Sequence, residues 1–242
     1  SQNFMELPLQ EVSTTASYAL KIAIKTMFPL SLFYYFEIGA LLISVLVLYK
    51  FNHEPMHWFI PFLLLMVCTE LTARYIRYVQ HEPNTWLFNI SIPVEYFFYG
   101  FIIGSLCLTA SLKKIIFYST FLFGIWTLIN LFFVQGFIQL NTETLKIGSS
   151  VMIFFSCIGF VDLFKNDNHQ TLLKNPLFWI CTGVLFFNTG EFLYLFFLDA
   201  FINNHWDKTA KLFASINNKL IYVLYTCISI AIVCSKKWEK KA

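Results

Sequence analysis

The stretch 56–78, MHWFIPFLLLMVCTELTARYIRY, decides the fold class of this chain. It is long and apolar enough to cross a bilayer as one helix, since a spanning helix needs about 20 predominantly apolar residues. A helix also satisfies every backbone N–H and C=O within itself, as hydrocarbon requires. Glu70, Arg74 and Arg77 stand near its carboxyl end, at a spacing that places all three on one helix face. The stretch therefore predicts a transmembrane helix that carries a polar stripe.

Further stretches of the chain have the same apolar character and comparable length. Hydrophobic residues make up 57% of the 242 residues and charged residues only 13%, a composition far from that of a soluble domain. We therefore predict an all-α membrane protein, a seven-transmembrane-helix bundle. The expected spans are Phe28–Tyr49, Met56–Tyr78, Trp86–Leu108, Ile115–Gly136, Leu145–Phe164, Leu177–Leu198 and Leu212–Cys234.

These spans define one transmembrane domain, residues 28–234. Residues 1–27 precede it as a lead-in with a mildly amphipathic stretch, which we expect to form a helix at the membrane surface. Residues 235–242 follow as a basic tail. The connections between the spans are short and polar, so none is long enough for a second domain.

The charge and the cysteines argue against several classes of protein. The formal net charge is only +3 and the lysines are scattered, which argues against a nucleic-acid partner. The six cysteines all fall within apolar stretches, without a CxxC pair or a Cys/His spacing typical of a metal site. This pattern argues against a disulfide framework and a zinc site. The partner that the composition itself predicts is the lipid bilayer.

Lysines are more numerous on one side of the expected bundle. With seven spans the termini lie on opposite sides, and the positive-inside rule assigns the lysine-rich side to the cytoplasm. We therefore predict a cytoplasmic C-terminus, an outside N-terminus and a multi-pass location in a bacterial cytoplasmic (inner) membrane. The lysines on the side of the C-terminus are Lys50, Lys113, Lys114, Lys165, Lys174, Lys236, Lys237, Lys240 and Lys241.

Most polar side chains within the spans gather in the half of the expected bundle nearest the N-terminus. A charge in hydrocarbon costs on the order of 3 kcal/mol, so these groups are expected to face inward and to pair or meet water. We infer a polar cavity that opens outward, with Arg74 as the counter-ion of Glu95 or Glu191. Asp162, near the opposite end of its span, is interpreted as an interfacial residue. The predicted ligand-binding residues are Glu70, Arg74, Glu95, Asn130, Asn188, Glu191, Asn217 and Lys219.

A structural interpretation of the same residues stays open. Polar side chains in membrane helices also form hydrogen bonds between helices, worth about 0.6 kcal/mol each on average. Gly100 and Gly104 form a GxxxG pair, a spacing that permits close helix approach, and we interpret it as packing within the chain.

Catalytic and cofactor chemistry have little support in the sequence. All five histidines fall in expected loops or at span ends, and none repeats with metal-site spacing. We predict no catalytic residue, no metal site and no cofactor. Lys219 and Glu95 resemble the retinal-binding lysine and counter-ion of rhodopsins, which leaves retinal on Lys219 as an alternative.

Other stretches resemble an uncharacterised seven-helix family of Bacteroidota inner-membrane proteins. They are 93–97, PVEYF; 130–135, NLFFVQ; and 175–180, NPLFWI, followed by 189–192, TGEF. The resemblance covers most of the chain from the second span onward, although Lys219 departs from the family pattern. Some relatives are associated with histidine kinases, which implies a sensory role. The residues that match recurring family positions are Glu95, Asn130, Gln135, Pro176, Phe178 and Trp179.

Together these features predict a sensory or ligand-binding membrane module. Its outward-opening polar cavity would recognise a small polar or amphiphilic molecule, and it would signal through a separate partner such as a histidine kinase. The alternative is a structural or assembly subunit of a membrane protein complex. An intramembrane enzyme or a retinal-binding protein ranks third.

Overall fold

The structure of the chain, a computed structural model, describes residues 32–49, 55–166, 169–197, 201 and 211–238. The long elements within these residues are all helices, and the described part of the chain contains no strand. They are α2 (Phe33–Leu48), α3 (Phe59–Tyr75), α4 (Thr85–Leu106), α5 (Ala110–Ile129), α6 (Thr142–Asn166), α7 (Pro176–Phe196) and α9 (Lys211–Trp238). Short 3-10 segments are η1 (Met56–Trp58) and η4 (His169–Lys174), and π-helical segments are η2 (Ile76–Gln80) and η3 (Asn130–Val134).

Six helices of the described chain are long and apolar enough to cross a membrane. They correspond to the second through seventh expected spans, so the prediction of an α-helical multi-pass membrane protein is confirmed. The six segments are Met56–Gln80, Thr85–Leu106, Ala110–Val134, Thr142–Asn166, Pro176–Phe196 and Ala214–Ser235.

The first expected span, Phe28–Tyr49, is represented by the shorter helix α2. Its 16 residues rise about 24 Å at about 1.5 Å per residue, less than the roughly 30 Å of a bilayer core. Residues 28–31 lie outside the described residues, so a first span over Phe28–Tyr49, and with it a total of seven, stays a prediction. The same holds for the lead-in, residues 1–27. At the other end α9 continues to Trp238, so the expected tail begins as helix, and 239–242 lie outside the described residues.

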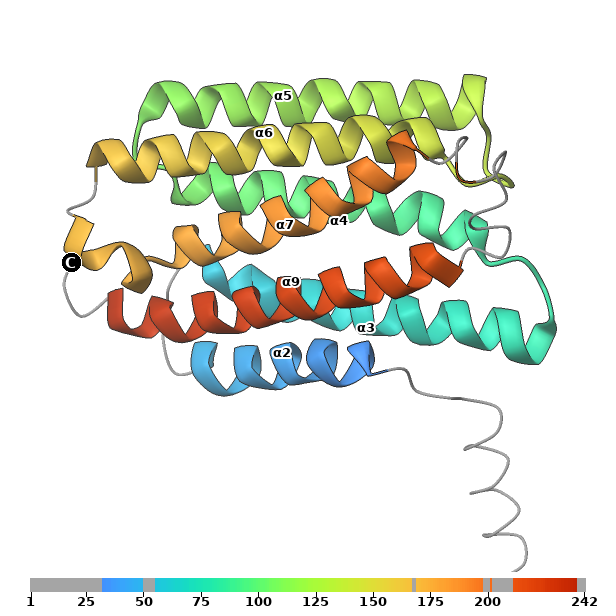
Figure 1. The fold of residues 1–242 in the computed structure, drawn as a ribbon, viewed down its shortest axis with the longest axis horizontal. Coiled ribbons are helices and arrows are strands. Elements are labelled where there is room, and N and C mark those ends of the chain that lie inside the picture. Colours follow the sequence, from blue (N-terminus) through green and yellow to red (C-terminus); the bar gives the residue numbers. More distant parts are fainter. Residues whose placement is uncertain (1–31, 50–54, 167–168, 198–200, 202–210, 239–242) are drawn as a thin grey trace, which may run out of the picture.

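The helices lie side by side in one bundle, with α5 and α6 along one edge and α2 along the opposite edge (Figure 1). Helix α7 packs against α6 and α9, α2 packs against α9 and α3, and α4 packs against α5 and α6. This order brings α3, α4, α7 and α9 to the middle of the bundle. One end gathers the start of α2, α4, α6 and α9 with the ends of α3, α5 and α7 (Figure 1). We refer to it as the polar end.

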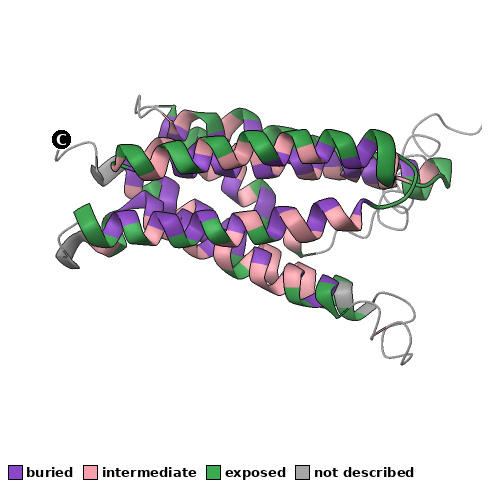
Figure 2. Ribbon diagram, turned by 90° about the horizontal axis from the view of Figure 1, so that it is seen from above, coloured by how far each residue is buried: buried purple, intermediate pink, exposed green. Residues whose placement is uncertain are grey.

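The helices are apolar on both their inner and their outer sides. Exposed residues follow the outward sides, and buried residues follow the sides that face other helices (Figure 2). Many exposed side chains are large and apolar, for example Leu46 at 73% and Phe133 at 83% exposure, and the buried core includes Phe59 and Phe155. A helix that is hydrophobic all round is typical of a membrane span. The outer apolar surface therefore fits a lipid environment.

The glycine pair of α4 brings α4 and α5 close together. A Cβ on Gly100 would come within 2.6 Å of the Thr120 hydroxyl oxygen. A Cβ on Gly104 would lie 3.2 Å from side-chain atoms of Ile116 and Phe117. The missing side chains permit this approach. The interpretation of this pair as packing within the chain is confirmed.

Asp162 is a buried link between helices at one end of the bundle, while its expected position at the membrane interface stays a prediction. Its side chain in α6 is only 1% exposed. Its carboxylate accepts hydrogen bonds from the backbone N–H groups of Leu108 at 2.8 Å and Thr109 at 2.9 Å, just before α5 begins. These N–H groups precede the first helical turn and need an acceptor. Asp162 supplies it from a neighbouring helix, at the end of the bundle opposite the polar end.

Replacing Asp162 with Ala should therefore destabilise the bundle. The substitution leaves two backbone donors at the start of α5 without their acceptor, at a cost of about 1–3 kcal/mol. We expect a lower midpoint of thermal unfolding for the purified chain in detergent. Lys165→Ala, an exposed position at the end of the same helix, is the control and should leave the midpoint nearly unchanged. Equal midpoints for the two variants would contradict this role of Asp162.

Candidate functional site

A cavity of about 410 Å³ lies in the half of the bundle near the polar end. Helices α3, α4, α6, α7 and α9 all contribute to its wall. Asn84, Thr85 and Leu140 line it close to the helix ends, and Leu224 and Tyr225 line it deeper in the bundle. The polar residues of the wall are Thr69, Glu70, Arg77, Asn84, Thr85, Ser91, Glu95, Tyr96, Glu191, Asn217 and Tyr225.

Glu191 of α7 is held by two hydroxyl groups from two other helices. Tyr96 of α4 donates to its Oε2 at 3.1 Å, and Ser149 of α6 donates to the same oxygen at 3.0 Å. Tyr96 is 2% exposed and Ser149 is fully buried, so both bonds lie away from the surface of the bundle. Because both donors converge on Oε2, Oε1 keeps its capacity to accept from another group.

Glu70 belongs to a second polar contact, which joins α2 to α3. The Tyr34 hydroxyl donates to Glu70 Oε2 at 3.2 Å, and Arg74 Nε donates to the Tyr34 hydroxyl oxygen. The Arg74 guanidinium also lies 4.1 Å from the centre of the Tyr34 ring, in cation–π contact. The structure thus places Arg74 against Tyr34, and the contacts described for Glu191 are with Tyr96 and Ser149 instead of the expected arginine.

Glu95 of α4 faces the cavity without a hydrogen bond or an ion pair to any residue that the structure describes. Its side chain is half-buried and lines the cavity. The charged groups that act on it are also carboxyl groups: Glu191, Glu37 and Glu70 each repel a negative charge on it. An unpaired group of this kind is costly in a bilayer, and it marks Glu95 as the centre of the candidate site.

Four of the predicted ligand-binding residues line the cavity and four do not. Those on the wall are Glu70, Glu95, Glu191 and Asn217. Lys219 is exposed on α9 and is absent from the wall, so its position gives no support to a retinal site at the cavity. Asn188 donates to the backbone carbonyl of Val184 one turn earlier in α7, at 2.8 Å. Arg74 contacts Tyr34, and Asn130 bonds to residues where α5 ends and α6 begins.

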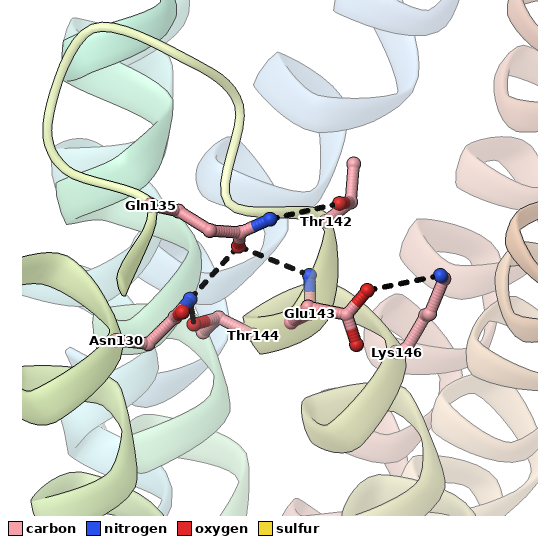
Figure 3. Close-up of polar contacts among 6 residues, drawn as sticks. All are labelled: Asn130, Gln135, Thr142, Glu143, Thr144 and Lys146. Carbon is pink, nitrogen blue, oxygen red and sulfur yellow. Dashed lines mark hydrogen bonds and ion pairs between the residues drawn. The ribbon is translucent and has the colours of Figure 1, made fainter. Parts of the chain in front are cut away.

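Asn130 is part of a separate cluster where α5 ends and α6 begins (Figure 3). Its Nδ2 donates to Gln135 Oε1 at 2.9 Å and to Thr144 Oγ1 at 2.7 Å. Gln135 in turn donates to the Thr142 hydroxyl and accepts from the backbone N–H of Glu143. These bonds fix the turn between two helices. The structural interpretation therefore fits Asn130.

Sequence reasoning did not select several cavity residues, although their spacing contains a signal. Phe88, Ser91 and Glu95 follow each other at intervals of three and four residues and share one face of α4. Asn217, Ile221 and Leu224 repeat this pattern on α9. An apolar residue or a serine at such a position is too common in a span to be selected from composition alone.

The arrangement suits noncovalent binding of a small molecule. The volume falls within the roughly 300–1,000 Å³ typical of ligand pockets, and apolar walls combine with a few polar groups, as in such pockets. Within the described residues, no group of three or more His, Cys, Asp or Glu side chains could hold a metal ion. The carboxyl groups therefore surround a space instead of converging on one ion.

Gly148 should be essential to the wall of this cavity. A Cβ at position 148 would lie 2.1 Å from Cε2 of Tyr96, so Gly148→Ala must displace the buried ring and disturb its bond to Glu191. Such overpacking costs about 1–3 kcal/mol, and the thermal midpoint should fall. Gly39→Ala is the matched control, because no atom lies within 4 Å of its added Cβ, and it should unfold at the same or a higher temperature. A Gly148→Ala variant as stable as the control would contradict this close packing of Gly148 against Tyr96.

Comparisons with known families, proteins and structures found no match to this chain. No protein-family model matches it, no curated protein matches it, and no solved structure matches it. The family resemblance found in the sequence therefore stays a prediction.

Proposed function

We propose that this protein is an integral membrane sensory or ligand-binding module, and that the cavity around Glu95 is its binding site. The observation that carries the proposal is the combination of an internal space of about 410 Å³ with an unpaired carboxyl group on its wall. A protein selected for stability alone would fill or pair such a site, whereas binding sites commonly keep groups that are poorly satisfied without their ligand.

The proposal includes a topology. Counting Phe28–Tyr49, the chain has seven spans, with the N-terminus outside and the C-terminus in the cytoplasm of a bacterial inner membrane. The lysine distribution supports this orientation. The polar end then faces outward, and the cavity samples the medium beyond the membrane. The ligand is a small polar or amphiphilic molecule.

Signalling requires a second protein in this proposal. Ligand binding would shift the packing of α4, α7 and α9, the helices that surround Glu95 and Glu191, and a partner at their cytoplasmic ends would detect the shift. The family resemblance suggests a histidine kinase as that partner. Copurification from membranes, with and without substitutions in the cavity, addresses the pairing directly.

An assembly subunit is the second candidate, because the Asn130 cluster uses intramembrane polar groups purely to join helix ends. If Glu95 and Glu191 served the same purpose, their neutral replacements would weaken the bundle or its attachment to partner chains. A binding site predicts the reverse at Glu95, whose carboxyl group has no bond to lose.

Glu95→Gln and Asn130→Ala should therefore shift stability in opposite directions. Gln at position 95 removes the repulsion from Glu70 and Glu191, so we expect an unchanged or higher thermal midpoint. Ala at position 130 removes two hydrogen bonds and leaves partners unsatisfied, at a cost of about 1–3 kcal/mol, so its midpoint should fall. The measurement is thermal unfolding of the full chain in detergent. A loss at Glu95→Gln as large as that at Asn130→Ala would favour the assembly subunit.

A further inference from the structure

We infer that the ligand of this cavity is a small organic cation, with an ammonium group that binds between the carboxyl groups of Glu95 and Glu191. The inference rests on the proposed function, since it names the class of molecule that the same site would bind. It follows from the balance of charge, the balance of hydrogen-bond donors and acceptors, and the shape of the wall.

Carboxyl groups predominate among the ionisable side chains of the cavity wall. Glu70, Glu95 and Glu191 contribute three carboxyl groups from three helices. Among the described lining residues Arg77 is the one cationic side chain, and it is exposed at the polar end, where water and salt screen its charge. Arg74 is engaged with Tyr34. A cation in the cavity would balance carboxyl groups that repel each other.

Two acceptors on the wall have no donor among the described residues. The hydroxyl groups of Tyr96 and Ser149 already donate to Glu191, and the Tyr225 hydroxyl forms a hydrogen bond with Glu37. Glu95 and the Oδ1 atom of Asn217 have nothing to accept from within the described chain. A ligand that brings donors would satisfy these acceptors. An ammonium group carries three N–H donors and a positive charge, which is the complement that this wall lacks.

The rest of the wall favours an organic cation over a metal ion. The space is far larger than a bare ion needs, and no metal-binding group of side chains is present among the described residues. Phe88, Ile92 and Phe187 provide an apolar surface beside the carboxyl groups. A short hydrocarbon segment next to the ammonium group would pack there and be withdrawn from water.

Matched probes that differ only in one terminal group test the inference. The probes are 4-amino-1-butanol, 1,4-butanediol and 4-hydroxybutyrate, which carry a positive, a neutral and a negative end at pH 7. Binding to the full chain in detergent is measured by isothermal titration and by the shift of the thermal midpoint with concentration. We expect the aminoalcohol to bind and to raise the midpoint by about 3 °C near ten times its dissociation constant, and the other two to have no effect.

Substitutions locate the bound cation. Glu95→Gln and Glu191→Gln should each weaken binding of the aminoalcohol at least tenfold, because each removes one charge-assisted hydrogen bond. Glu191→Gln keeps a carbonyl oxygen for Tyr96 and Ser149, so the fold is expected to persist. Glu143→Gln is the control: this carboxylate pairs with Lys146 on α6 outside the cavity, and its removal should leave binding unchanged.

Several outcomes would overturn the inference. They are equal binding of the diol or the hydroxyacid, no binding of any probe, or full binding by both Gln variants at positions 95 and 191. Binding of a neutral or anionic probe would still leave the cavity as a ligand site. Failure of the proposed function itself is measured separately, by the stability of Glu95→Gln against Asn130→Ala, which requires no ligand.

Discussion

The absence of water inside a bilayer is the constraint on which this structure depends, and the bonds of Glu191 show it most clearly. A carboxyl group from α7 accepts from Tyr96 of α4 and Ser149 of α6, so three helices must keep one relative position. Apolar packing alone would not set that position, because lipid tails compete equally well for an apolar helix face. The fixed wall leaves Glu95 beside a space that the chain does not fill.

The architecture could be predicted from the sequence because the length of an apolar stretch alone decides whether a helix spans the bilayer. The second through seventh spans were placed correctly in this way, and their depth also indicated where Glu70, Glu95, Glu191 and Asn217 would gather. Depth is simple to infer, since it follows from counting residues from a span end at a fixed rise. The prediction that these four residues lie at the cavity therefore depended on their depth in the spans alone.

The sequence could not predict how each helix is rotated about its axis, and so which of its side chains face the cavity. A soluble helix shows its inner side by an apolar stripe, but these helices are apolar all round, so Lys219 and Asn217 appear equivalent in sequence while one is exposed and the other lines the cavity. Contacts between distant residues were equally hidden. Nothing near Asp162 in the sequence indicates that its carboxylate accepts hydrogen bonds from the backbone N–H groups of Leu108 and Thr109.

The close approach of Gly148 to Tyr96 also has an evolutionary consequence. A side chain at position 148 requires a smaller residue at position 96 or a different orientation of the Tyr96 ring. A smaller residue at position 96 would lack the hydroxyl that donates to Glu191. The three positions are therefore expected to change together across descendants of a common ancestor. A lineage without a glycine at position 148 would therefore be expected to have a different set of residues around the cavity.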